Sequence, residues 1–196
     1  VAVDGALKQL YSLNQGEGTL TTLSTVDGRI LKTTAVGTPV RVVTVSPTTR
    51  RVFATAAQTL TVLDGNTLGV LATVTVGRTP VGIALDEANN RIYVASQQSG
   101  TISALNATTY QIVNTWSPPL GNVWGLAIDP SLRRLYVSII KNTVADFGGI
   151  EVLHADTGAY VAQISAGAEL VAVNSRTHVV YATDPRGNTL SVRSRF

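Results

Sequence analysis

The stretch NNRIYVAS at Asn89–Ser96 combines two turn-forming residues with a short apolar run centred on a tyrosine. Variants of this stretch return four more times along the 196-residue chain, as KQLYSLNQ from Lys8, RRVFATAA from Arg50, RRLYVSII from Arg133 and HVVYATD from His178. The aromatic residues Tyr11, Phe53, Tyr93, Tyr136 and Tyr181 are separated by 42, 40, 43 and 45 positions. A recurrence of roughly 40–50 residues is the spacing of β-propeller blades.

Each repeat also keeps one internal order. In the third unit, PVGIALD predicts a buried strand, EANN a turn, and RIYVAS, TISALN and QIVNTW three further strands. The hairpin between the last two strands carries Asp27-Gly28, Asp64-Gly65, Asn106-Ala107 or Asp156 to Gly158, from which we expect the positive φ angles of the turn. One such sheet leaves apolar side chains on both faces, so neighbouring sheets must stack.

The sequence therefore predicts an all-β fold, a β-propeller of four-stranded antiparallel blades with an aromatic residue wedged between adjacent sheets. About five blades are expected, at roughly 1–39, 40–80, 81–122, 123–167 and 168–196, and the last is incomplete. Because the first unit opens on an inner strand and the fifth lacks its outer strand, we expect part of a six- to eight-bladed ring. A partner or second chain that closes the ring is one alternative, and a self-closed five-bladed ring is another.

The composition is typical of an all-β chain, and it argues against several classes of function. Hydrophobic residues make up 44% and charged residues 14% of the chain, a balance that favours strands over helices. The net charge of +3 comes from scattered basic residues, so no nucleic-acid partner is expected. The absence of cysteine excludes disulfides and thiolate chemistry. No apolar run reaches the roughly 18 residues of a membrane span, and no signal peptide is visible.

The runs LYSLN, IYVAS, LYVSI and VYATD, with the passage VGRTPVGIAL, resemble the YVTN family of β-propellers. The resemblance implies a propeller that is secreted, periplasmic or at the cell surface, with a protein or surface polymer as its partner. Related propellers include cofactor-oxidising and lactone-cleaving enzymes, so the resemblance indicates the fold more sharply than the function.

Two sets of residues are candidates for binding. Arg41, Trp124 and Glu169 take equivalent places where inner strands begin, the end of a propeller at which ligands usually meet the central channel. A guanidinium, an indole and a carboxylate can hold a polar or anionic ligand; a rim salt bridge beside a packing tryptophan is the alternative. The second set, Lys141, Asp146 and Phe147, belongs to an insertion, KNTVADFGG, that only the fourth unit carries; drift in a tolerant loop is the alternative.

Other polar residues receive structural interpretations. His154 and His178 are expected to be separate hairpin or surface residues at the opposite face, and Asp4, Asp86 and Asp129 to cap turns. No catalytic residue, metal site or cofactor is predicted. The favoured function is a non-catalytic extracytoplasmic scaffold. The alternatives are a lactonase-like, lyase-like or cofactor-binding redox enzyme with its site at the channel mouth, and a structural subunit of a larger assembly.

Overall fold

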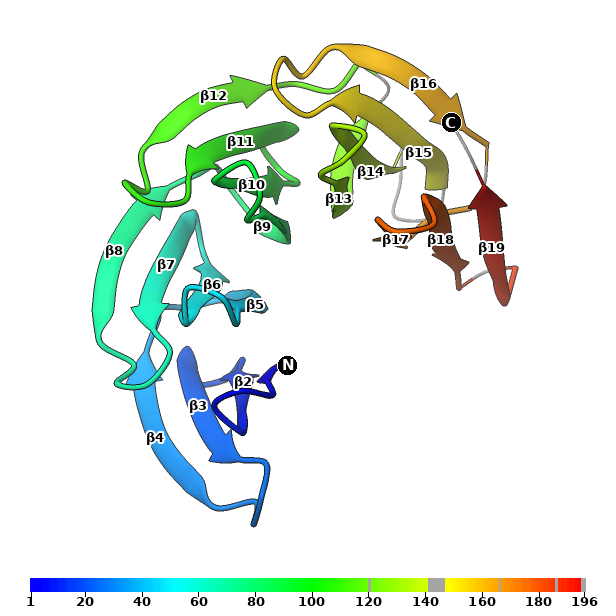
Figure 1. Ribbon diagram of the computed structural model, residues 1–196. Coiled ribbons are helices and arrows are strands. Elements are labelled where there is room, and N and C mark those ends of the chain that lie inside the picture. Colours follow the sequence, from blue (N-terminus) through cyan, green and yellow to red (C-terminus); the bar gives the residue numbers. More distant parts are fainter. Residues whose placement is uncertain (120, 141–146, 166, 186, 195–196) are drawn as a thin grey trace. The chain divides into compact units, whose positions relative to one another are not determined.

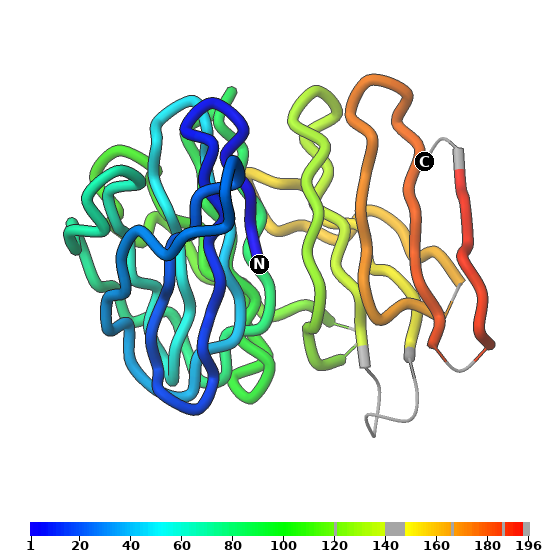
Figure 2. Tube along the Cα trace, turned by 90° about the horizontal axis from the view of Figure 1, so that it is seen from below, coloured from blue at the N-terminus to red at the C-terminus, as the bar shows by residue number. Residues whose placement is uncertain are grey.

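The computed structural model describes residues 1–119, 121–140, 147–165, 167–185 and 187–194, and its regular elements there are all β-strands. The chain divides into two compact units, Val1–Val81 and Gly82–Phe196. Within each unit, consecutive strands pair antiparallel into separate sheets, as Figures 1 and 2 show for the ribbon and for the chain trace.

The first unit holds two four-stranded sheets. Blade 1 is β1 (Ala2–Asp4), β2 (Gln9–Asn14), β3 (Thr19–Ser24) and β4 (Ile30–Ala35), and blade 2 is β5 (Val40–Ser46), β6 (Arg51–Ala56), β7 (Thr59–Asp64) and β8 (Val70–Thr75). Both sheets are simple meanders, in which each strand pairs with the one before it in the sequence.

The second unit holds the other three sheets. Blade 3 is β9 (Pro80–Asp86, which begins in the last residues of the first unit), β10 (Arg91–Ser96), β11 (Thr101–Asn106) and β12 (Ile112–Trp116). Blade 4 is β13 (Asn122–Asp129), β14 (Arg134–Ile140), β15 (Phe147–His154) and β16 (Tyr160–Ile164), and blade 5 is β17 (Leu170–Asn174), β18 (Val179–Asp184) and β19 (Thr189–Ser194). Within the described residues, blade 5 has three strands.

The cores lie between sheets, where the aromatic face of one blade packs on the opposite face of the next. Tyr11 of blade 1 and Tyr93 of blade 3 are fully buried in this way. Their hydroxyls donate to the carbonyl oxygens of Gly65 in blade 2 and Ala155 in blade 4, at 3.0 and 3.1 Å. The predicted wedge is thus confirmed inside each unit.

The hairpins between the third and fourth strands differ from the sequence-based expectation. The positive φ angle falls on Gly28 and Gly158 as expected, but on Leu68 and Tyr110 in blades 2 and 3, instead of on Gly65 or Ala107. The turn is five residues long, and the amide of its fifth residue donates to the carbonyl four residues earlier, as Leu68 does to Asp64 at 2.8 Å. The turn length therefore fixes the left-handed position, and this hydrogen bond offsets the cost of a side chain there.

Candidate binding site

The inner strands β5 and β13 each begin with a β-bulge. In β5, Val40 pairs with Ala56 and Val43 with Ala54, so Arg41 and Val42 together lie opposite a single residue of β6. In β13 the same shift places Trp124 and Gly125 opposite a single residue of β14. Because a β-bulge changes the direction of the side chains at that point of a strand, the bulge positions present their side chains differently from the other positions of the inner strands.

A hydroxyl group fills each bulge. Thr55 Oγ1 accepts from the Val42 amide at 3.1 Å and donates to the Pro80 carbonyl at 3.2 Å. Ser138 Oγ accepts from the Gly125 amide at 2.6 Å and donates to the Glu169 carbonyl at 2.8 Å. These hydroxyls satisfy backbone groups that the bulge removes from the ladder, and Ser138 also links the inner strands of blades 4 and 5.

The second unit brings Trp124 and Glu169 onto adjoining backbones. A Cβ added at Gly125 would lie 3.1 Å from the Glu169 carbonyl oxygen, and one added at Gly82 would lie 2.9 Å from that of Trp124. Only glycine permits strands to approach so closely. Trp124 and Glu169 are both half-buried, and neither side chain hydrogen-bonds to another residue within the described part of the chain. An indole at the start of β13 and a carboxylate directly before β17 are thus available to a ligand.

Arg41, the third candidate, is exposed and occupies the equivalent bulge position in the first unit. The structure relates it to Trp124 and Glu169 by register only, because they belong to the other unit. A joint site of all three residues therefore stays a prediction.

The candidate residues of the insertion lie mostly outside the residues that the structure describes. Lys141 and Asp146 lie outside the described residues, and Phe147 is described only by its backbone, which opens β15 opposite Ile140. The surrounding strands are long, with seven residues in β14 and eight in β15. Their hairpin is therefore extended relative to those of the other blades.

Sequence reasoning missed the charged links between blades. The Asp86 carboxylate at the end of β9 is completely buried, and its Oδ2 pairs with Arg133 Nη1 from the first turn of blade 4. Arg133 also pairs with Asp156 through Nη2, and its Nε donates to Asp156 at 3.1 Å. This guanidinium hydrogen bond holds the pKa of Asp156 below its usual range.

A second link joins blades 4 and 5. His178 Nδ1 lies 2.7 Å from Oδ2 of Asp129, whose side chain is also fully buried. Burial opposes ionisation of Asp129, but hydrogen bonds from His178, Ser131 and the Leu132 amide outweigh it and lower the pKa of Asp129. His178 lies in a hairpin turn as expected, with 35% of its side chain exposed, but the expectation did not include its contact with the neighbouring blade. The signal was available, because Lys8, Arg50, Arg133 and His178 begin the quoted repeats.

The predicted caps are present beside these links. Asp4 Oδ1 accepts from the amides of Ala6 and Leu7 at 2.9 and 3.0 Å, and Asp129 Oδ1 accepts from those of Ser131 and Leu132. The described residues hold no group of three histidine or acidic side chains placed to bind a metal ion. Nor do they include a helix with the length and apolar character to cross a bilayer.

Comparison with known proteins finds a clear likeness in three dimensions. No protein-family model and no curated protein matches the sequence. Among solved structures, a WD40 β-propeller chain in the crystal structure of the mitotic checkpoint complex superposes with a TM-score of 0.81 at 12% identity. The match covers 96% of this chain and 59% of that one, so this chain spans less than two thirds of the length of the chain it matches. At this identity the likeness concerns the fold, and it confirms the predicted all-β propeller.

Proposed function

We propose that this chain is a non-catalytic propeller scaffold that binds a protein partner through residues at the starts of its inner strands. The observation that carries the proposal is the placement of Trp124 in β13 and of Glu169 directly before β17 on adjoining backbone, both half-buried and without a side-chain hydrogen bond to the described residues. The likeness to a propeller in a multiprotein complex supports a protein as the partner.

The chemistry of the pair favours a cationic group on that partner. An indole face attracts a guanidinium or ammonium ion, and a carboxylate beside it adds a charge-assisted hydrogen bond. The backbones under both residues are held by Ser138, so little ordering cost remains when a ligand arrives. An arginine or lysine side chain of a partner is the group that fits these two residues.

We also propose a family and a cellular location for this chain. The repeated Tyr-centred runs support membership of the YVTN family, and that resemblance supports a secreted, periplasmic or surface location. Fractionation of source cells with an antibody to this chain tests the location, and recovery in the cytosolic fraction alone would exclude it.

The binding test uses a displayed library of random peptides selected on the immobilised chain. We expect enriched peptides to carry arginine or lysine and to lose at least tenfold in affinity against Trp124→Ala, the range of an aromatic hot spot. Glu169→Gln should also lower the affinity of those peptides that carry arginine or lysine, because it removes the charge of the carboxylate. Val113→Ala, an exposed change on outer strand β12, is the matched control and should bind like the parent. Equal binding to W124A and V113A would remove the site from the proposal.

A further inference from the structure

A buried carboxylate oxygen lies without a hydrogen bond at the end of the inner strand of blade 1. Asp4 ends β1 and is fully buried, and its Oδ1 accepts from the amides of Ala6 and Leu7. Its Oδ2 accepts no hydrogen bond from the described residues. Since Asp4 lies two residues beyond Ala2, which pairs with Tyr11, its side chain belongs to the aromatic face that packs on blade 2. A buried anionic oxygen is costly unless a donor, and above all a cation, faces it.

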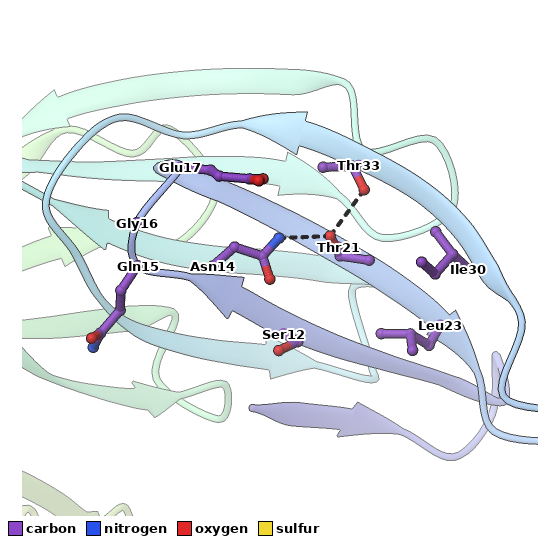
Figure 3. Close-up of a pocket in the computed structure, with 9 residues that line it drawn as sticks. All are labelled: Ser12, Asn14, Gln15, Gly16, Glu17, Thr21, Leu23, Ile30 and Thr33. Atoms are coloured by element: carbon purple, nitrogen blue, oxygen red, sulfur yellow. Dashed lines mark hydrogen bonds between the residues drawn. The ribbon is translucent and has the colours of Figure 1, made fainter.

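Polar side chains on the other face of blade 1 do have partners. Asn14 Nδ2 donates to Thr21 Oγ1 at 2.8 Å, and Thr21 Oγ1 lies 2.9 Å from Thr33 Oγ1, as the dashed lines in Figure 3 show. The unmatched oxygen of Asp4 is therefore a feature of its own interface with blade 2, and not of polar groups throughout this blade.

The equivalent oxygen has a basic partner at both interfaces of the second unit. Asp86 Oδ2 pairs with Arg133 Nη1, and Asp129 Oδ2 lies 2.7 Å from His178 Nδ1. Each partner is the residue directly before the second strand of the following blade. In blade 2 that residue is Arg50, whose φ of 53° is the same as that of Arg133.

The acidic and the basic positions also change together along the sequence. Asp4, Asp86 and Asp129 are each followed, in the next repeat, by a basic residue directly before the second strand. Where the inner strand ends in Ser46 instead, the corresponding residue is the neutral Asn90. A charge at one position is thus matched by a charge at the other, as expected of two partners.

The backbones of Arg50 and Arg133 occupy equivalent places. The carbonyl oxygen of each accepts at 2.9 Å from an amide on the hairpin of its own blade, that of Gly65 or of Ala155. These two hairpin residues also accept the tyrosine hydroxyl of the preceding blade, at 3.0 and 3.1 Å. The blades therefore approach each other equally closely, and an arginine side chain has the same distance to span at both interfaces.

The electrostatics around the two tyrosines agree with this equivalence. Burial, and next the charges of Asp4 and Asp64, raise the pKa of Tyr11 to about 12. Burial also raises the pKa of Tyr93, but the charge of Arg133 opposes that rise. The surroundings of Tyr11 are therefore negative at the place where those of Tyr93 hold a guanidinium.

We propose that the Arg50 guanidinium turns inward to pair with Asp4 Oδ2 and so clasps blade 1 to blade 2. The Arg50 side chain is exposed and makes no hydrogen bond or ion pair with the described residues, so no contact there holds it away from Asp4. The exposed position is the open form of the clasp, and the pair with Asp4 is the closed form. Closure gives the buried carboxylate its counter-ion, and removing one partner of such a pair is strongly destabilising.

A double-mutant cycle followed by circular dichroism melts tests the clasp. Arg50→Asn should lower the melting temperature of the chain by about 5 °C, because it leaves Asp4 buried without a counter-ion. Asparagine suits the left-handed turn, since Asn90 has a φ of 55° at the equivalent place. In an Asp4→Asn background, the same change should lower the melting temperature by less than about 1 °C. Arg176→Asn, which removes an equal charge from an exposed turn, is the matched control and should melt like the parent.

Exchange of the Arg50 Nε proton with water, measured by NMR, observes the clasp directly. In the parent we expect this proton to exchange at least about tenfold more slowly than that of Arg176, because it lies in a charge-assisted pair, and in D4N at a similar rate. Three results would overturn the proposal: an R50N melt equal to that of the parent, an equal loss from R50N with and without the Asp4 carboxylate, and an Arg50 proton that exchanges as fast as that of Arg176. Should D4N fail to fold, the exchange rates in the parent decide between the open and the closed form.

Discussion

The charged link between blades 3 and 4 can be replaced by the uncharged residues that the chain carries at the corresponding positions of blades 2 and 3. Ser46 and Asn90 occupy in blades 2 and 3 the register positions that Asp86 and Arg133 occupy in blades 3 and 4. Ser46 Oγ accepts from the amide three residues later at 3.1 Å, as Asp86 Oδ1 does at the same distance. Asn90 and Arg133 share a left-handed backbone, with φ of 55° and 53°. Asp86→Ser and Arg133→Asn therefore preserve the local turns.

Arg133→Asn alone should be costly. It leaves the fully buried Asp86 carboxylate without its counter-ion, a change that typically costs 3–5 kcal/mol. The Asn89 side chain still donates to both Asp86 oxygens, and 21% of the Arg133 side chain is exposed, so we expect about 2–3 kcal/mol. For a chain of this size, that lowers the melting temperature by roughly 5–10 °C.

The double variant should recover most of the loss, because a neutral pair replaces a charged one and no buried charge remains. The assay is thermal unfolding followed by Trp116 fluorescence, which reports on unit 2, where its ring stacks on Tyr93 at 6.2 Å between centroids. A Trp124→Phe background removes the second indole. A coupling energy below about 0.5 kcal/mol, the size of ordinary non-additivity, would refute the reasoning.

Three further outcomes follow from single groups. Ser138→Ala should destabilise the chain by about 2–3 kcal/mol in a thermal melt, since it strands a buried amide and carbonyl, whereas Ser131→Ala at an exposed cap should cost less than about 1 kcal/mol. Because the folded pKa of Asp129 is lowered, its stabilising effect is present above the unfolded value and is lost as the pH falls through the folded one; Asp129→Asn should flatten the acid limb of the melting-temperature profile. The pKa of Tyr11 is raised to about 12 by burial and by the charges of Asp4 and Asp64, so its contribution is complete below about pH 10 and is lost towards pH 12; Tyr11→Phe should remove one late step from the phenolate absorbance titration. A melt of D129N as acid-sensitive as the parent, or an unchanged titration of Y11F, would contradict the last two.

The fold could be predicted from the sequence because its signals are local and repeated. Alternating strands such as RIYVAS show the face that each side chain occupies, and the aromatic residue at a fixed place in every unit shows that both faces are covered. The positive φ angles at Leu68 and Tyr110 were not predicted, because an inference from residue type alone assigns a positive φ to glycine. The length of the turn decides the position instead, and that length follows from the pairing of the flanking strands.

The site was only partly predictable, because its geometry depends on contacts between units of the repeat. The sequence places Trp124 at the start of an inner strand, but it does not show the β-bulge there. That bulge depends on the Ser138 hydroxyl of the next strand and the Glu169 carbonyl of the next blade. The same holds for Arg133, whose two carboxylate partners lie 47 and 23 residues away. A basic residue at the head of several repeats is visible in the sequence, but its partner is not.

Repetition also explains where specificity can arise in this chain. The aromatic wedge, the turn caps and the links between blades recur along the chain. The same packing requirement therefore restricts which residues fit at equivalent positions of these blades. The first residue of the inner-strand bulge is different: it is Arg41 in blade 2 and Trp124 in blade 4, and Glu169 takes the corresponding place in blade 5. Packing accepts a cation, an indole and an anion at this place because the backbone there is held by a neighbouring hydroxyl. Since the backbone at these positions is held independently of the side chain, the side chain can vary with the chemistry of a partner, and this is the physical reason for proposing them as the recognition site.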